Sequence, residues 1–338
     1  MGLQIDIAAI LANHAALAAR APGARAAAVV KADAYGLGAD RVAPALYAAG
    51  VRDFFVALAR EGRAIRPLLP PDARINILSG HMEGEDLSGL VPVLNSPAQF
   101  FRDRVLRPGK PFAIQLDSGM NRLGMEAAEW GAIRAEAMAA RPEFIMSHLA
   151  CADEPDHPAN AAQLAAFRAM TEGCDVPRSL AATGGILLGP DYYFDMVRPG
   201  VGLYGGLPFA EARPVVTLSL RVIQTRAVAA GEMVGYGATW HAARDSRIAT
   251  VDAGYADGIL RALSSSGAKL YAGEIACPIV GRVSMDLITV DVTDLDHVPD
   301  RLALICPAQP IDRLADLAGT IGYEVLTSLG LRYARTYL

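Results

Sequence analysis

Residues 26–49 read AAAVVKADAYGLGADRVAPALYAA, and this stretch contains the pattern that decides the fold. A short apolar run, Ala26–Val30, leads into Lys31 and a Gly-containing turn, and an Ala-rich segment of helical length, Asp40–Ala49, follows. Continuous apolar runs of this length are typical of strands that a parallel sheet buries on both faces. The stretch therefore predicts a strand, a turn and a crossover helix, with Lys31 at the end of the strand.

The same alternation continues along the first part of the chain. Segments between the apolar runs, such as Ala128–Ala140, are typical of helices. The further apolar runs, of which the last two are weaker, are Phe54–Ala57, Ile75–Leu78, Val91–Leu94, Phe112–Leu116, Phe144–Ser147, Ser179–Ala182 and Asp195–Arg198. A set of eight strand–helix units predicts a TIM (β/α)8 barrel over residues 1–210, and an open doubly wound sheet is the alternative.

The alternation of apolar runs and Ala-rich segments ends near Pro208–Pro214. Beyond this point, strand-like runs separated by Gly and Pro predict a mostly β domain over residues 211–338. Two terminal helices are expected at Asp312–Ile321 and Tyr323–Leu329. The strand-like runs are Val215–Ala229, Arg247–Val251, Lys269–Tyr271, Cys277–Ile279 and Leu287–Val292.

Composition excludes several classes of protein. Hydrophobic residues make up 52% of the 338 residues, which is too many for a largely disordered chain. The formal net charge of -5 argues against binding to nucleic acid or to an anionic membrane. The four cysteines form no Cys-x-x-Cys pair, and we find neither a signal-peptide pattern nor an apolar stretch that could span a membrane. We therefore expect a cytoplasmic protein that holds no metal.

Lys31 is the first residue that suggests chemistry. In a barrel, polar residues that follow the strands lie at the active-site end. A desolvated lysine at that end loses proton affinity and can form a Schiff base with a carbonyl compound. A lysine at the end of a strand is by itself more often a solvated surface residue, so the assignment needs the wider sequence context.

That context is a series of motifs in which the chain resembles alanine racemases over nearly its whole length. The lysine motif VVKADAYGLG begins the series at Val29. The motifs that follow, each given with its first residue, are LDSGMNRLG (Leu116), SHLACAD (Ser147), VRPGVGLYG (Val197), GYGATW (Gly235), GYADG (Gly254), GRVSMD (Gly281) and IGYE (Ile321). The resemblance implies a TIM barrel followed by a β domain, the cofactor pyridoxal 5'-phosphate, and interconversion of L-alanine and D-alanine.

The resemblance implies two catalytic bases. Lys31 would hold the cofactor covalently and, once released from it, act on one face of the substrate Cα, while Tyr236 would act on the other face. His148 and Arg198 would form a hydrogen-bonded chain that helps Tyr236. Arg198 would also face the pyridine nitrogen of the cofactor, and because a guanidinium has no acceptor it would leave that nitrogen unprotonated.

Further binding roles follow from the same resemblance. Arg122 and the backbone N–H of Met285 would hold the substrate carboxylate, and Tyr255 would line the entrance with Asp286 nearby. The residues implied around the cofactor are Lys31, Tyr35, Thr183, Arg198, Gly200, Val201 and Tyr323. The active sites would be shared between the two chains of a homodimer, and D-alanine would feed peptidoglycan precursors in a bacterium.

Two positions depart from the family pattern. Gln115 stands where many members carry a modified lysine, and its amide is expected to hydrogen-bond Arg122 instead. Ala182 stands where an asparagine is usual, although Thr183 keeps the hydroxyl that follows it. These departures leave the range of substrates open, so that a racemase of serine or lysine is an alternative. A non-catalytic cofactor carrier and a decarboxylase of the same architecture are more distant alternatives.

Overall fold

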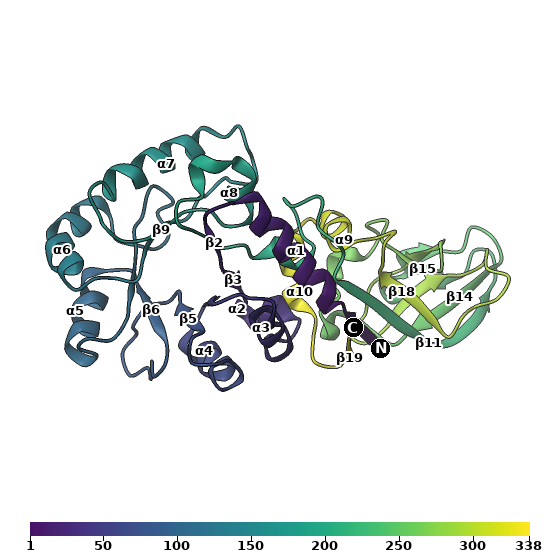
Figure 1. The fold of residues 1–338 in the computed structure, drawn as a ribbon. Coiled ribbons are helices and arrows are strands. Elements are labelled where there is room, and N and C mark those ends of the chain that lie inside the picture. The colour runs from purple at the N-terminus through teal and green to yellow at the C-terminus, as the bar shows by residue number, and fades with distance from the viewer. The chain divides into compact units, whose positions relative to one another are not determined.

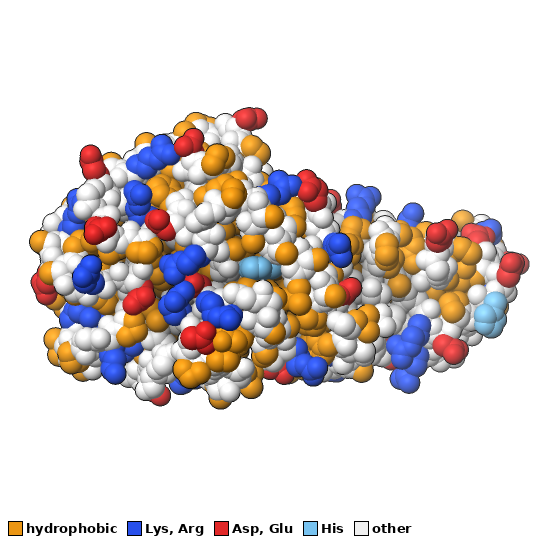
Figure 2. All heavy atoms as spheres, viewed as in Figure 1, with side chains coloured by type: hydrophobic (Ala, Val, Ile, Leu, Met, Phe, Trp, Pro, Cys, Tyr) orange, Lys and Arg blue, Asp and Glu red, His pale blue; other side chains and the backbone are white.

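A computed structural model describes residues 1–338 and divides into two compact units. The first is formed by Leu11–Ala212, and the second by Met1–Ile10 together with Arg213–Leu338. Figure 1 shows the first as strands surrounded by helices and the second as a mainly β structure. On the face drawn in Figure 2, acidic and basic side chains are interspersed rather than gathered by sign.

The unit Leu11–Ala212 is the predicted barrel of parallel strands. Seven strands pair in chain order, from β3 to β9, and every pairing is parallel. The ring closes because β10 pairs with β2 on one side, while Arg198, just after β10, bridges to Ala182, just after β9. The strands are β2 (Arg25–Ala26), β3 (Ala28–Val29), β4 (Asp53–Val56), β5 (Arg74–Ile77), β6 (Val91–Leu94), β7 (Ala113–Gln115), β8 (Ile145–Met146), β9 (Arg178–Ser179) and β10 (Met196–Val197). The eight predicted apolar runs all overlap these strands.

Helices cover the outside of the barrel, and local sequence signals start several of them. At the start of α5, the Ser96 hydroxyl accepts a hydrogen bond from the N–H of Gln99 and Pro97 occupies the first turn, as is usual for a helix N-terminus. The helices of this part of the chain are α1 (Ile7–Arg20), α2 (Lys31–Gly36), α3 (Ala39–Ala48), α4 (Ala59–Ile65), α5 (Pro97–Leu106), α6 (Ala127–Ala139), α7 (Pro158–Met170) and α8 (Thr183–Leu188). Short 3-10 turns lie at Arg66–Leu68, Pro190–Tyr192 and Val201–Tyr204.

Apolar side chains fill the barrel. Phe55, Val93, Phe144 and Met146 belong to one fully buried cluster, and the rings of Phe55 and Phe144 meet edge to face with centroids 5.8 Å apart. A second buried cluster, which includes Trp130 of α6, packs helices against the outside of the strands. The interior is therefore a packed core rather than a pore, so a ligand can bind only at an end of the barrel.

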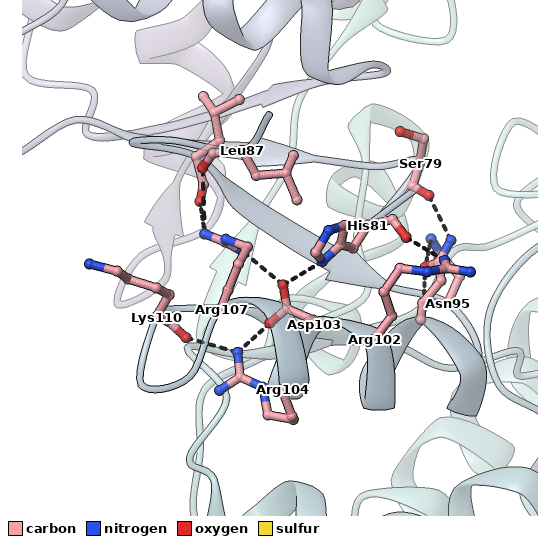
Figure 3. Close-up of polar contacts among 11 residues, drawn as sticks. Ser79, His81, Leu87, Asn95, Arg102, Asp103, Arg104, Arg107 and Lys110 are labelled. Carbon is pink, nitrogen blue, oxygen red and sulfur yellow. Dashed lines mark hydrogen bonds and ion pairs between the residues drawn. The ribbon is translucent and has the colours of Figure 1, made fainter. Parts of the chain in front are cut away.

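The connection from β5 to β6 differs from the predicted alternation because it contains no helix. An ionic cluster fixes this loop to α5 instead (Figure 3). The fully buried Asp103 carboxylate accepts a hydrogen bond from Arg107 at 2.8 Å and contacts Arg104. It also lies 2.9 Å from Nδ1 of the loop residue His81. Arg107 also donates to the backbone oxygen of Leu90 at 2.9 Å, so the cluster holds both ends of the loop.

The second unit is an antiparallel β barrel closed by its longest strand, β11 (Val216–Val228). The first part of β11 pairs with β18, and the second part pairs with β14. The remaining neighbours run in the order β14, β17, β16, β15, β18, which completes the ring. These strands are β14 (Ser246–Val251), β15 (Lys269–Ala272), β16 (Ile275–Val280), β17 (Ile288–Asp291) and β18 (Arg301–Ile305), and helices α9 (Ile311–Ala318) and α10 (Gly322–Ser328) follow them.

The first residues of the chain belong to this second unit. The prediction differs here, because it placed all of residues 1–210 in the barrel. Strand β1 (Gly2–Ile5) pairs antiparallel with β11 and parallel with β19 (Ala334–Tyr337). This placement satisfies the backbone groups along an otherwise open edge of β11 and buries Leu3 and Ile5 completely. No helix in the structure combines the length and apolar character that a membrane span requires.

The ionic cluster at Asp103 generates a stability prediction. Asp103→Ala removes the carboxylate that pairs with Arg104, Arg107 and His81. We expect it to lower the free energy of unfolding by about 3 kcal/mol, because these largely buried side chains lose their counter-charge. Asp191→Ala is the matched control, since it breaks the solvent-exposed pair with Arg168 and should cost less than about 1 kcal/mol. Urea denaturation measures both, and equal losses would show that the cluster does not support the barrel.

Candidate active site

Lys31 lies at the mouth of the barrel, directly after β3, and begins an unusual turn. Ala32, Asp33, Ala34 and Tyr35 all have φ between 52° and 56°, so they form a left-handed helical turn. Such a turn costs roughly 1–2 kcal/mol for each residue that carries a Cβ, and it persists only where neighbouring contacts hold it. The sequence predicts a Gly-containing turn after Lys31, but the handedness of the turn is evident only in the structure.

Aromatic packing holds the far end of this turn. The Tyr35 ring is buried and lies with its centroid 4.6 Å from that of Tyr204. The Tyr204 hydroxyl donates to the backbone oxygen of Val29 at 2.9 Å, and complete burial raises its pKa well above the usual value. Tyr204 therefore stays protonated and acts as a fixed hydrogen-bond donor beneath the turn. Tyr204 is not among the predicted site residues, since an isolated Tyr in a Gly-rich motif gives no signal.

Arg198 is a fully buried cation whose protein partners are all neutral. Its guanidinium donates to the Ser179 hydroxyl at 2.5 Å and to the backbone oxygens of Ser147 and Leu180 at 2.6 and 3.3 Å. Burial lowers its pKa to about 9. A buried guanidinium normally has a carboxylate partner, so this arrangement leaves its charge to act on the barrel mouth. Ser147 and Ser179, which orient it, were not identified from the sequence.

His148 lies beside Arg198. Its Nδ1 is 3.5 Å from an Arg198 nitrogen, which is a long contact for a hydrogen bond. Burial, followed by the charges of Arg198, Arg122 and Lys31, lowers the His148 pKa to about 3. The imidazole is therefore neutral at pH 7, with one nitrogen available to accept and the other to donate.

Thr183 organises a cradle of backbone N–H groups at the end of β9. Its hydroxyl oxygen accepts from the N–H of Gly200 at 3.0 Å and from that of Gly202 at 3.3 Å. Both positions require glycine, because a Cβ on Gly200 would lie 2.6 Å from the Tyr35 hydroxyl oxygen and one on Gly202 would lie 2.7 Å from Thr183. Val201 begins the 3-10 turn between them. Tyr35, Thr183, Gly200 and Val201 thus lie close together at the barrel mouth.

Arg122 is exposed at the barrel mouth, where its charge helps burial to lower the pKa of Lys31. The predicted hydrogen bond from Gln115 to Arg122 is wrong. The buried Gln115 amide donates instead to the backbone oxygen of Leu123 at 3.0 Å. The physical reason is that the loop after β7 folds back, with Met125 bridging to Leu116, which brings the Leu123 carbonyl over Gln115. Gln115 thus fixes the backbone next to Arg122 rather than its guanidinium.

The second unit brings three other predicted residues together. Tyr255 donates its N–H to the backbone oxygen of Ser284 at 3.0 Å, and the N–H of Ala256 donates to the oxygen of Met285 at 2.9 Å. Arg332 fixes this arrangement, because it forms a paired contact with the buried Asp257 and donates to Asp286 at 2.8 Å. The Asp286 carboxylate therefore contacts Arg332, a residue that the sequence reasoning missed.

Tyr236 lies in a tight turn between β12 (Met233–Val234) and β13 (Trp240–His241), and its side chain is 72% exposed. The flanking Gly235 and Gly237 have φ of 80° and 72°, and the Arg282 guanidinium lies against Gly237. Tyr323 lies in the first turn of α10 and is also partly exposed. These residues belong to the second unit, whereas the residues around Lys31 belong to the barrel.

Comparison with known proteins identifies the family. The model of the alanine racemase N-terminal domain matches residues 5–208, and that of the C-terminal domain matches residues 215–337. The chain belongs to the alanine racemase family. It is 61% identical to the alanine racemase of Dinoroseobacter shibae over 99% of this chain and 97% of that protein, and 58% identical to that of a Jannaschia species over 98% and 97%.

Solved alanine racemases share the fold of this family member. The enzyme from Bartonella henselae, described with covalently bound pyridoxal phosphate, superposes with a TM-score of 0.94 at 39% identity and covers 100% of this chain and 99% of its own. The biosynthetic alanine racemase from Pseudomonas aeruginosa superposes with a TM-score of 0.91 at 36% identity and the same coverage. These matches confirm the resemblance, which the motifs indicate, and the predicted fold class of a TIM barrel followed by a mostly β domain.

The low pKa of His148 generates a pH prediction. The folded pKa of about 3 lies below the usual 6.5, so below pH 6.5 the unfolded chain takes up a proton that the folded chain does not. When the pH is lowered from 7.5 to 5.5, we expect the free energy of unfolding of the wild type to fall by about 1 kcal/mol more than that of a His148→Gln variant. Urea denaturation at both pH values tests this, and parallel losses in the two proteins would contradict a neutral His148.

Proposed function

We propose that this chain is a pyridoxal-phosphate-dependent alanine racemase in which Lys31 and Tyr236 are the two bases. The observation that carries the proposal is the concentration of positive charge at the barrel mouth. The charges of Lys31, Arg122 and Arg198 all lower the pKa of His148, and no carboxylate contacts Arg198. An excess of positive charge at one end of a barrel suits a small anionic ligand. Membership of the alanine racemase family gives that ligand its chemical class.

The residues present fit pyridoxal phosphate. The Thr183 cradle offers hydroxyl groups and closely approaching backbone at the start of α8, an arrangement that suits a phosphate group. Lys31 is an amine whose pKa burial and the nearby Arg122 lower, which favours attack on an aldehyde. Arg198 is a buried donor that lacks an anionic partner and suits a neutral ring nitrogen. Tyr323 would add a further hydroxyl to the phosphate from the second unit.

Bound pyridoxal phosphate supplies a conjugated ring that accepts electron density from the substrate Cα. Arg198 limits this electron withdrawal, because a guanidinium cannot give the ring nitrogen a proton at neutral pH. A weaker electron sink favours prompt return of a proton to Cα over side reactions. His148, held neutral by its surroundings, can pass a hydrogen bond between Arg198 and a phenol without itself becoming charged.

Racemisation needs a proton removed from one face of Cα and a proton delivered to the opposite face. Lys31 Nζ serves one face, and its lowered pKa makes the neutral, proton-accepting amine accessible. Tyr236 Oη serves the other. The His148–Arg198 pair would assist Tyr236 through a hydrogen bond. Arg282, whose guanidinium lies beside the Tyr236 turn, would add positive charge near the phenol.

Arg122 and Met285 would bind the substrate carboxylate. A guanidinium matches a carboxylate with two parallel hydrogen bonds, and a backbone N–H adds a third. Tyr255 and Asp286 lie next to Met285, so they would border the route by which the substrate enters. An entrance bordered by large side chains favours alanine over larger amino acids.

The site needs residues from both units, and we infer that it forms between two copies of the chain. Tyr236 is 72% exposed, Met285 54% and Tyr255 42%, so the second unit presents these groups on its surface. In a symmetric dimer, the barrel of one chain would meet the second unit of its partner, which gives two equivalent sites.

All four cysteines are free, in agreement with a cytoplasmic location.

Replacement of the two bases tests the assigned roles. Lys31→Ala should abolish covalent attachment of pyridoxal phosphate and the associated absorbance. Tyr236→Phe should keep the cofactor but slow racemisation by roughly 10²–10⁴-fold, the usual contribution of one acid–base group. Optical rotation and α-deuterium incorporation with L-alanine in D₂O measure both variants, and serine and lysine run alongside measure specificity. Unchanged activity in the Phe variant would refute the role of Tyr236.

Mixing the two inactive variants tests the shared site. A hybrid dimer of Lys31→Ala and Tyr236→Phe chains contains one site with both bases intact, whereas each homodimer contains none. Random exchange makes about half of the dimers hybrid, so about a quarter of the wild-type activity should return. Each variant subjected alone to the same exchange is the control. No recovery, with exchange verified by mass spectrometry, would indicate that each chain builds its site alone.

A further inference from the structure

Glu61 occupies a position that the mechanism above does not use. It lies in the first turn of α4, the helix after β4, and β4 is the neighbour of β3 in the barrel. Its Oε2 accepts hydrogen bonds from the N–H groups of Ala57 at 2.7 Å and Leu58 at 3.2 Å. These two bonds cap the start of α4, which is a common structural use of an acidic residue in a first helical turn.

A third hydrogen bond connects Glu61 to the residue after Lys31. Its Oε1 accepts from the N–H of Ala32 at 3.0 Å. One carboxylate therefore joins the ends of two adjacent barrel strands, and the link on the β3 side is made at the first residue of the left-handed turn. A cap on α4 alone would need only the contacts to Ala57 and Leu58.

The left-handed turn needs such support at this end. At its far end, Asp33 accepts from the N–H of Ala39 at 2.7 Å and Tyr35 packs on Tyr204. At its near end, Ala32 is exposed and borders a hollow of about 520 Å³, which Glu61 also lines. Side-chain packing does not enclose the turn there, so the hydrogen bond to Glu61 is the polar contact that fixes the Ala32 backbone.

We propose that Glu61 is a positioning residue for Lys31, because its carboxylate holds the backbone from which the Lys31 side chain extends toward the barrel mouth. Glu61 also opposes part of the shift that burial and Arg122 impose on Lys31, since its charge raises the pKa of that amine. The inference rests on the proposed function of Lys31 as the residue that binds pyridoxal phosphate covalently. It adds a residue to which neither the sequence motifs nor the mechanism assigned a role.

Two predicted effects of Glu61→Gln can be measured separately. Loss of the charge lowers the pKa of Lys31, so the rate of covalent attachment should reach its half-maximal value at a lower pH. Loss of the strong carboxylate hydrogen bonds loosens the turn, so the plateau rate at high pH, where Lys31 is fully neutral, should fall roughly tenfold. A misplacement of the reacting group by about 1 Å can cost roughly 100-fold in rate, so a smaller displacement of the Lys31 amine accounts for a loss of about tenfold. Gln keeps the side-chain length and one acceptor oxygen, so the start of α4 remains capped.

The experiment follows attachment of added pyridoxal phosphate to the full-length chain by absorbance from about pH 6 to about pH 11, the range in which a lysine with a lowered pKa titrates. The matched control is Glu129→Gln, because Glu129 in the first turn of α6 accepts from the N–H of Glu126 at 3.1 Å but has no contact with the Lys31 turn. The control should lose a comparable amount of thermal stability and keep both the plateau and the midpoint of the wild type. A Glu61→Gln plateau within about twofold of the wild type would overturn the proposal.

A second variant tests the turn itself. Gly adopts positive φ without steric penalty, so Ala32→Gly added to Glu61→Gln should recover several-fold of the lost plateau rate. No recovery would mean that Glu61 does not act through the turn. Failure of the proposed function gives a different result, since the wild-type chain would then form no covalent bond, or Lys31→Ala would still form one.

Discussion

Parallel pairing of the barrel strands is the constraint on which the rest of this structure depends. Parallel strands that close into a ring must all end on the same side, so the residues that follow them meet there whatever their separation in the chain. Lys31, His148, Thr183 and Arg198 are brought together in this way. The closing contact, the bridge from Ala182 to Arg198, lies beside the residues that carry the chemistry.

This convergence makes the electrostatics of the site a collective property. Arg198 is buried on neutral acceptors. Burial of His148, together with the charges of Arg198, Arg122 and Lys31, keeps its imidazole neutral. Burial and Arg122 in turn make Lys31 a weaker base. Each pKa depends on groups contributed by other strands, so a substitution at one of these positions changes the protonation of the others.

The structure also uses polar groups to hold backbone where regular packing is missing. Asp103 and its arginines secure a crossover that has no helix, Glu61 secures a left-handed turn, and Arg332 fixes Tyr255 relative to Met285. Each is a charged side chain that bonds to segments distant in sequence. Such groups stabilise particular conformations more than they add net free energy, because desolvation offsets much of the attraction.

The sequence by itself determined the barrel, the β domain, the eight strand positions and the family, because apolar periodicity and contiguous motifs such as VVKADAYGLG are local properties of the chain. Tertiary structure alone decided the pairing of β1 with β11, the orientation of Gln115 toward Leu123 rather than Arg122, and the partners of Arg198. It also decided which polar side chains matter outside the motifs, such as Glu61, Tyr204 and Arg332. Hydrogen bonds between residues far apart in sequence depend on how the backbone closes in space, and no local pattern encodes that geometry.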